Sequence, residues 1–401
     1  MAGLYVHIPF CRSRCIYCGF YSTVALEQRQ RYVDAVCREM EAHPFPLPEG
    51  MGIDTIYLGG GTPSQLTPEQ LHQLFIYINK VYAPLSLQGG AGGGPEVTIE
   101  VNPDDVTVEY AAGLQQLPIN RISMGIQTFD DDRLRFLHRR HTAAQARQAV
   151  ATLRAAGFHN ISIDLMYGFP GETLNDWQRD VDAAIALDVE HISAYCLTLE
   201  EGTVLFEQMR NEKLEMRNGN EAMSNEEAEE QERQMYELLM DKLVAAGYEH
   251  YEISNFAKQG YRSRHNSSYW HDEPYIGLGA AAHSYHSPLQ SEGVGGRLFA
   301  CRSWNVANIH SYMDAIEQGR IPCEQEVLDD DTHYNDRITT ALRTREGLDL
   351  STLSDKHRDY CQHEAQPFLN DGLLSLDGNH LHLTRKGLFV SDYIMSSLVY
   401  V

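Results

Sequence analysis

The sequence has few basic residues for its length, and it contains no long apolar segment. Lys and Arg together number 32 against 56 Asp and Glu in 401 residues, which gives a formal net charge of −24. A bulk charge of this sign disfavours nucleic acid and anionic membrane surfaces as partners. No apolar run reaches the roughly 18 residues that suggest a transmembrane helix. We therefore expect no transmembrane segment, whereas peripheral contact with a membrane stays open.

The N-terminus lacks the features of a secretory signal peptide. Met1–Leu4 lead directly into an apolar segment, with no basic region before it. The chain has eight cysteines. Without an export signal, these cysteines indicate reduced thiols in a cytoplasmic protein, not a disulfide framework.

Three cysteines form the most informative motif in the chain. Cys11, Cys15 and Cys18 follow the apolar run Leu4–Ile8, which we predict to be a strand, in the spacing C-x3-C-x2-C. Three thiolates on one loop suit a soft metal centre. Zinc would require a fourth ligand at similar spacing, but the next cysteine, Cys37, lies in a helical pattern and does not provide one. An iron–sulfur cluster with one open iron is therefore favoured, with a small zinc knuckle or unrelated thiols as the alternative.

Strand and helix patterns alternate through the first half of the chain. Six strand–helix units at this spacing predict an α/β fold with a parallel sheet, namely a partial (β/α)6 TIM-like barrel that is open on one side. Active sites in such folds lie at the C-terminal ends of the strands. The predicted strands are Leu4–Ile8, Thr55–Leu58, Val97–Val101, Arg121–Gly125, Ile161–Met166 and His191–Leu197. The predicted helices are Glu27–Met40, one that opens at Thr67, Val108–Leu117, Ala143–Ala156 and Leu174–Leu187.

We divide the chain into three regions: the barrel at 1–200, an extension at 201–325, and a C-terminal domain at 326–401. The extension contains a long helix predicted at Glu221–Ala246, and Gln88–Pro95 within the barrel is predicted to be a Gly-rich loop. Helical segments followed by a hairpin around Asp377-Gly378 resemble a winged-helix-like domain. A wing can bind DNA, but the acidic chain favours a structural or lid role.

The cysteine motif, together with the sequence Y-V-H-I-P-F-C that ends at Cys11, resembles the cysteine motif of the radical S-adenosylmethionine (SAM) superfamily. Within it, the chain is similar to anaerobic coproporphyrinogen III oxidases and their relatives, the HemW heme chaperones. The resemblance implies that Cys11, Cys15 and Cys18 hold a [4Fe–4S] cluster whose open iron chelates SAM. It also implies that an electron from the cluster cleaves SAM to a 5′-deoxyadenosyl radical.

Further positions match SAM-contacting positions of this family in order along the chain. Each has an ordinary alternative, such as a plain glycine turn, a salt-bridged carboxylate, a surface amide or cation, or a capping acid, but the ordered set is specific. Phe20 is expected to pack near the adenine. The SAM-binding residues that the resemblance implies are Tyr5, Phe20, Gly60, Gly61, Thr62, Glu100, Gln127, Arg139 and Asp164.

Three features separate the chaperone from the oxidase branch. First, oxidases of this family carry an N-terminal extension before Y-V-H-I-P-F-C, whereas only Met1–Leu4 precede it here. Second, the oxidases have a further cysteine where this chain has Phe20. Third, residues 265–270 read H-N-x-x-Y-W, which resembles the HemW signature associated with heme. His265 is suited to be an axial iron ligand, and Asn266, Tyr269 and Trp270 complete the candidate heme site. The alternative is a structural loop with a hydrogen-bonded His265. His283 further along could face the pocket or the core.

These features favour a heme chaperone with a SAM-coordinated [4Fe–4S] cluster. Its partners would be heme, an acceptor protein and an electron donor, and we assign no catalytic residue. One alternative is an oxygen-independent coproporphyrinogen III oxidase, which decarboxylates propionate side chains by means of a SAM-derived radical. Another is a radical methyltransferase, for which the sequence offers no substrate site.

Overall fold

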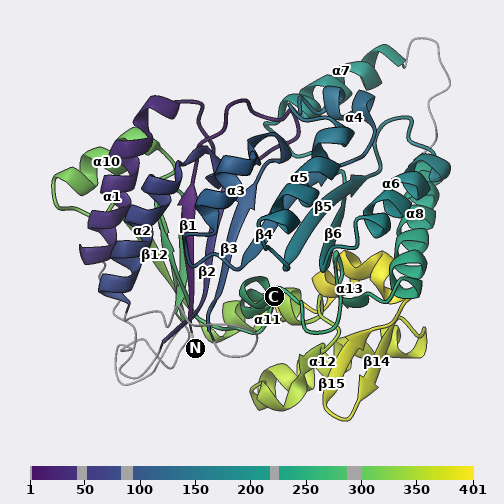
Figure 1. Cartoon of the computed structure of the whole chain (residues 1–401). Coiled ribbons are helices and arrows are strands. Elements are labelled where there is room, and N and C mark those ends of the chain that lie inside the picture. The colour runs from purple at the N-terminus through teal and green to yellow at the C-terminus, as the bar shows by residue number, and fades with distance from the viewer. Residues whose placement is uncertain (1, 43–51, 83–93, 217–224, 287–299) are drawn as a thin grey trace, which may run out of the picture.

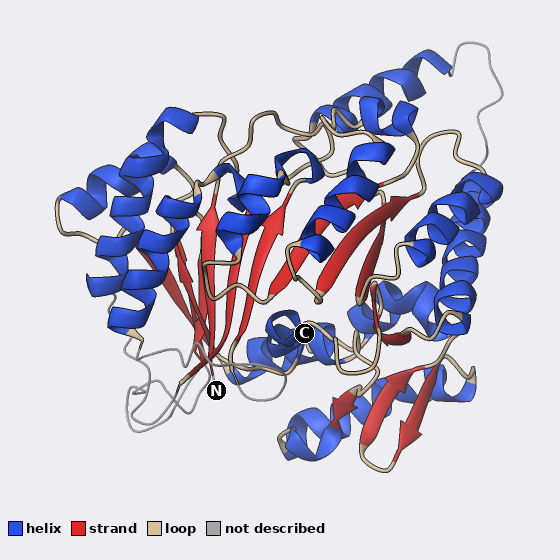
Figure 2. Cartoon of the chain, viewed as in Figure 1, coloured by secondary structure: helices blue, strands red, loops and turns tan. Residues whose placement is uncertain are grey.

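The computed structural model describes residues 2–42, 52–82, 94–216, 225–286 and 300–401 (Figure 1). Six parallel strands, β1–β6, stand side by side in chain order, with helices covering their outer face (Figure 2). The predicted α/β architecture is confirmed. The strands are β1 (Ala2–Ile8), β2 (Ile53–Gly60), β3 (Glu96–Val101), β4 (Arg121–Gln127), β5 (Ile161–Tyr167) and β6 (His191–Cys196). The helices among them are α1 (Arg29–Ala42), α2 (Pro68–Val81), α3 (Val108–Leu114), α4 (Asp131–Phe136), α5 (Ala143–Ala155) and α6 (Leu174–Ala186).

The sequence explains these elements locally. Parallel strands covered by helices are apolar along most of their length, and β1 is buried at six of its seven positions. Thr67 is the N-cap of helix α2. Its side chain accepts from the Gln70 backbone N–H, and its own backbone N–H donates to the Gln70 side-chain oxygen. This capping box, with Pro68 at the first helical position, fixes the helix start where the pattern predicts it.

The sheet continues beyond the barrel strands at both edges. Its twelve strands in the described part of the chain run in the order β12-β11-β10-β9-β1-β2-β3-β4-β5-β6-β8-β7. The added strands are β7 (Glu249–Glu252), β8 (Asn255–Ala257), β9 (Tyr275–Leu278), β10 (His283–His286), β11 (Ala300–Asn305) and β12 (Cys323–Leu328). The region 201–325 therefore extends the barrel sheet, in addition to helices α7 (Val204–Met216), α8 (Asn225–Ala245) and α10 (Ile309–Glu317).

A short helix, α9 (Arg264–Trp270), lies in the connection between β8 and β9, which flank the six barrel strands on opposite sides. The chain leaves β8 beside β6, passes through α9, and enters β9, which pairs in parallel with β1. Thr55, near the start of β2, bonds to a side chain of α9. Helix α9 therefore lies at the N-terminal ends of the barrel strands, opposite the end where the cysteine loop begins.

The C-terminal region has its own apolar core, formed by residues between Tyr334 and Leu398. The hairpin predicted around Asp377-Gly378 is confirmed, as β14 (Leu374–Asp377) and β15 (His380–Leu383), joined in one sheet by β13 (Leu348–Asp349). Its helices are α11 (Asp330–Ala341), α12 (Asp355–Asn370) and α13 (Ser391–Ser397). Most of the predicted Gln88–Pro95 loop and the first residues of the predicted 221–246 helix lie outside the described residues. Within the described residues, no helix has the length and apolar character to cross a bilayer.

Candidate radical SAM site

The first cysteine of the loop, Cys11, is three residues past the end of β1, and the loop is closed by backbone hydrogen bonds. Thr23 N–H donates to the Pro9 carbonyl at 2.7 Å, and Cys11 N–H donates to the Thr23 carbonyl at 2.8 Å. Between the cysteines, Ile16 is buried in a small apolar cluster with Leu137, Met166, Phe169, Leu197 and Leu205. Ile16 therefore anchors the middle of the loop, so that the cysteines on either side are held at the C-terminal rim of the barrel.

The three loop cysteines are free and partly exposed. Burial raises the pKa of Cys11 and of Cys18, while Thr62 Oγ1 lies 3.4 Å from the Cys11 sulfur. An Arg139 N–H points to the Cys15 sulfur at 3.7 Å. Among the described residues, no three His, Cys, Asp or Glu side chains converge as ligands on one metal ion. A [4Fe–4S] cluster takes each thiolate on a different iron, so its ligands lie further apart than those of a single ion.

The end of β2 brings backbone close to both the cysteine strand and Glu100. Gly60 has a φ of +113°, and its N–H donates to a Glu100 carboxylate oxygen at 3.1 Å. A Cβ on Gly61 would lie 2.7 Å from the Pro9 carbonyl carbon, so only glycine allows this approach. Burial raises the pKa of Glu100 to about 7, against a hydrogen bond from Tyr57 that lowers it. Glu100 is thus a partly buried carboxylate at the open rim, and no ion pair to it is recorded within the described residues.

Arg139 ties the neighbouring strand ends together. Its Nη2 donates to Asn102 Oδ1 at 2.8 Å and to the Gly125 carbonyl, and its Nε is buried without a recorded hydrogen bond. Gln127 has a φ of +71° at a register irregularity in β4, which turns the strand end as β-bulges near active sites do. Burial raises the pKa of Asp164, on β5, to about 6, with Arg121 acting in the opposite direction.

Asn102 is a rim residue that the sequence reading did not select. Its side-chain amide donates to Thr62 Oγ1 at 3.3 Å and its oxygen accepts from Arg139, so it connects the glycine loop to the arginine. The sequence spacing could have indicated Asn102. It stands two residues after Glu100, and side chains at that spacing along an extended chain share a face.

The two remaining predicted SAM residues are Phe20 and Tyr5. Phe20 is 72% exposed, and its predicted adenine contact stays a prediction. Tyr5 lies inside the barrel, where its hydroxyl bonds His7 Nδ1 at 3.0 Å and its ring stacks with Tyr57. His283 is exposed on β10 beside Trp304, so it is not a core histidine, and its place in the pocket stays a prediction.

The H-N-x-x-Y-W segment forms helix α9 and not a loop. His265 is 1% exposed, and both of its ring nitrogens are engaged, Nδ1 with Thr55 Oγ1 at 2.7 Å and Nε2 with the Tyr269 hydroxyl at 2.8 Å. Burial lowers the pKa of His265 to about 3. Trp270 packs near Tyr251, and Asn266 lies in the first turn of α9, where its N–H bonds Ser263. Iron ligation by His265 stays a prediction, and it would require the ring to break both bonds.

The rim fits the cofactors of the radical SAM superfamily. Three thiols on an anchored loop can hold a [4Fe–4S] cluster. Beside them, the partly buried Glu100 carboxylate and the orphaned Nε–H of Arg139 are complementary to the amino group and the carboxylate of an amino acid moiety. The fold and this constellation define a radical SAM protein. Residues 5–184 match the Radical SAM superfamily model, and residues 328–390 match the HemN C-terminal domain.

Within that superfamily, the chain belongs to the HemW family. It is 33% identical to the heme chaperone HemW of Bacillus subtilis (strain 168), with 100% of this chain and 99% of the relative covered. It is 32% identical to heme chaperone HemW of Lactococcus lactis subsp. lactis (strain IL1403), covering 98% and 96%. It is also 31% identical to the mitochondrial radical S-adenosyl methionine domain-containing protein 1 of Bos taurus, covering 99% and 87%. Coproporphyrinogen III oxidase (HemN) from Escherichia coli shares the fold, with a TM-score of 0.77, 21% identity, and coverage of 99% and 90%.

Proposed function

We propose that this protein is a heme chaperone that binds heme, transfers it to an acceptor protein, and carries a SAM-coordinated [4Fe–4S] cluster at the barrel rim. The observation that carries the proposal is the similarity to proteins named heme chaperone HemW over nearly the full length of both chains. Similarity that includes the extension and the C-terminal domain covers the regions outside the cofactor core, where branch-specific function would lie.

In this proposal Cys11, Cys15 and Cys18 ligate the cluster and the end of β2 approaches SAM. The backbone of Gly60 and Gly61 lets the ligand come close, and Thr62 braces the Cys11 sulfur. The remaining SAM contacts would come from Glu100, Gln127, Arg139, Asp164 and Tyr5, with Phe20 over the adenine. When bound, the cluster supplies one-electron chemistry to SAM, for which an electron donor would be needed.

The competing function is the oxidative decarboxylation of coproporphyrinogen III. The match to the C-terminal domain model named for HemN is the observation that favours it. Against this function, the chain is only 21% identical to the E. coli oxidase, and similarity at this level supports a shared fold but not a shared activity. Phe20 also stands where the oxidases have a further cysteine.

Two assays on one preparation of the protein can distinguish the two functions. The protein is purified without oxygen, its cluster is reconstituted, and one portion is assayed with coproporphyrinogen III, SAM and dithionite while another is titrated with heme. We expect saturable heme binding, release of heme to apomyoglobin as a surrogate acceptor, and no protoporphyrinogen IX. Decarboxylated product at many turnovers per protein would refute the chaperone function, and so would a failure to bind heme.

A further inference from the structure

Two histidines lie side by side on the C-terminal hairpin, which belongs to the small sheet outside the barrel (Figure 1). His380 and His382 are two residues apart on β15, so their side chains lie on the same face of the strand. Their rings are stacked, with centroids 6.0 Å apart and an angle of 22° between the ring planes. His380 is exposed and His382 is half-buried, whereas Leu381 between them is buried on the opposite face. The pair is therefore accessible from solvent.

Both rings are oriented in the same way by the backbone of one turn. His380 Nδ1 lies 3.2 Å from the Glu346 carbonyl oxygen, and His382 Nδ1 lies 2.9 Å from the Arg345 carbonyl oxygen. A carbonyl oxygen can only accept, so each Nδ1 carries the proton and each Nε2 keeps its lone pair. Within the described residues, no hydrogen bond is recorded for either Nε2. An imidazole whose Nδ1–H donates to a backbone carbonyl is the usual arrangement of a metal-ligating histidine.

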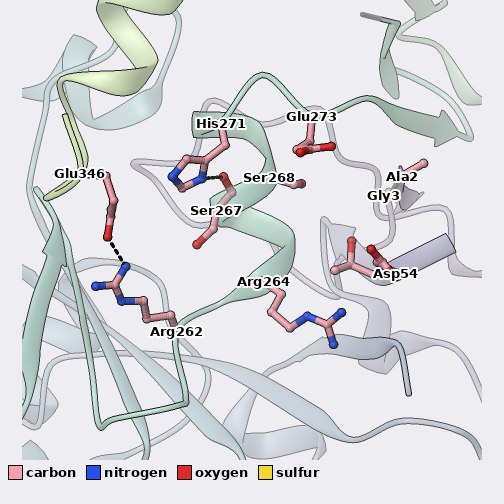
Figure 3. A pocket seen from close by; sticks show the side chains of 11 residues that line it. Ala2, Gly3, Asp54, Arg262, Arg264, Ser267, Ser268, His271, Glu273 and Glu346 are labelled. Carbon is pink, nitrogen blue, oxygen red and sulfur yellow. Dashed lines mark hydrogen bonds and ion pairs between the residues drawn. The ribbon is translucent and has the colours of Figure 1, made fainter. Parts of the chain in front are cut away.

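The turn at residues 345–347, which supplies these two carbonyls, is itself held in place. Figure 3 shows the Glu346 side chain paired with Arg262, at 2.7 Å. Gly347 follows with a φ of +69°, and a Cβ at this position would lie 2.7 Å from His382 Nδ1. Only glycine lets the turn pass this close to the ring. The two imidazoles are thus positioned before a ligand arrives, which lowers the entropic cost of binding.

The surroundings of the pair favour a cation. Asp349 on β13 and Asp377 on β14 are both directly opposite His380 in the three-stranded sheet. Side chains of directly opposite residues in antiparallel strands lie on the same face with Cβ atoms about 5 Å apart, so two carboxylates flank the histidines. Within the described residues, no third His, Cys, Asp or Glu side chain completes a ligand group. Water would therefore fill the remaining coordination positions of a bound ion.

We propose that His380 and His382 bind one divalent transition metal ion, of the class of Zn²⁺ and Ni²⁺, through their two Nε2 atoms. Imidazole nitrogen suits these ions, and it binds zinc at about 2.0–2.1 Å. To reach that distance, the stacked rings tilt toward each other about their side-chain bonds. The proposed chaperone function does not require this ion, so the histidine pair is an additional site on the C-terminal region.

The test is a Zn²⁺ titration of full-length, untagged protein with its cluster reconstituted, because free thiols of the cysteine loop would also bind zinc. Wild type should bind one Zn²⁺ at this site, and His380→Ala and His382→Ala should each weaken that binding by about tenfold or more. His363→Ala is the matched control, because His363 is exposed on α12, where it pairs with Glu364, and this variant should bind like wild type.

Footprinting with diethyl pyrocarbonate gives a second measurement that needs no substitution. The reagent modifies free imidazole nitrogens, and mass spectrometry locates the modified residues. Zn²⁺ should protect His380 and His382 together, while His363 stays reactive. Wild-type affinity in either alanine variant, or protection of only one of the two stacked rings, would overturn the proposal.

Discussion

Tyr57 stacks on His265 with ring centroids 5.1 Å apart, and its hydroxyl donates a 2.8 Å hydrogen bond to Glu100. One side chain thus contacts both the Glu100 carboxylate at the C-terminal rim of the barrel and helix α9 at the opposite end. A change in the charge or partner of Glu100 alters what the Tyr57 hydroxyl bonds to. This contact gives the rim where we propose that the cofactors bind a direct physical connection to α9.

Glu100 should make the stability of the cofactor-free protein depend on pH. Its pKa in the folded protein is about 7, above the ordinary 4.5, so the folded protein binds this proton more tightly than the unfolded chain does. The stabilisation is complete below the ordinary pKa and is lost as pH rises through 7. We expect the free energy of unfolding to fall by up to about 3 kcal/mol between pH 5 and pH 8 through this group.

Guanidinium unfolding at both pH values checks this expectation. Glu100→Gln should lose most of that pH dependence, whereas Glu201→Gln, at an exposed position, should keep it. An unchanged pH dependence in Glu100→Gln would show that Glu100 is ionised in the folded protein throughout this range.

Replacing Arg139 by lysine should weaken SAM binding to the reconstituted protein by about tenfold or more, because charge-assisted hydrogen bonds contribute roughly 1.5–3 kcal/mol. Lysine cannot reproduce the planar contacts to Asn102, Gly125 and the Cys15 sulfur. Isothermal titration with SAM measures the change. Arg140→Lys is the control, since Arg140 pairs with Asp104 and Asp105 instead. Equal affinities for the two variants would remove Arg139 from the SAM site.

Cys15→Ala should prevent stable cluster assembly, because two thiolates cannot hold a [4Fe–4S] cluster that already has one open iron. Iron and sulfide content after anaerobic reconstitution, together with visible absorption, measures the loss. Cys301→Ala changes a partly exposed cysteine on β11 and should retain wild-type iron content. Full iron loading of Cys15→Ala would contradict the ligand assignment.

Glu39 should be essential to stability although it lies far from the cysteine loop in the sequence. It is fully buried and accepts from Gly279 N–H at 2.8 Å, Tyr312 hydroxyl at 2.6 Å and Asn305 at 2.5 Å. Glu39→Ala leaves the Gly279 N–H and the Tyr312 hydroxyl without their acceptor and removes one of the two hydrogen bonds of the Asn305 amide, which keeps its bond to the Gly279 carbonyl. The free energy of unfolding should therefore drop by about 3 kcal/mol or more.

Urea unfolding measures this loss. Glu39→Gln keeps one acceptor oxygen and should lose less. Glu41→Ala, in the exposed ion pair with Lys80 on the same helix, should cost under about 1 kcal/mol. Similar losses for Glu39→Ala and Glu41→Ala would show that the buried network contributes little.

The sequence predicted the parts of the fold that carry strong local signals. The buried parallel strands are apolar runs between amphipathic helices, and Thr67 with Gln70 marks a helix start unambiguously. Rim residues such as Glu100 could be placed because strand ends share one edge. By contrast, β12 (Cys323–Leu328) is mostly exposed and polar, so nothing in its pattern indicates that it extends the barrel sheet.

The orientation of α9 is the main point that the sequence reading missed. A histidine in a motif associated with heme suggested a ligand, but which ring nitrogen is available depends on tertiary contacts. His265 Nδ1 is taken by Thr55, which is remote in sequence. The bond to Tyr269 was accessible to prediction, because residues four apart lie on one face of a helix.

The pairing of β1 with β9 has a consequence for how this chain is made. Gly3 pairs next to Tyr275, so the first strand to leave the ribosome waits for the last third of the chain to complete its hydrogen bonds. Until then, β1 is an unpaired apolar edge, which is a template for aggregation. Contacts of such long sequence separation also slow folding. Synthesis interrupted before Tyr275 would therefore leave the strand that leads to the cysteines as the aggregation-prone surface of the fragment.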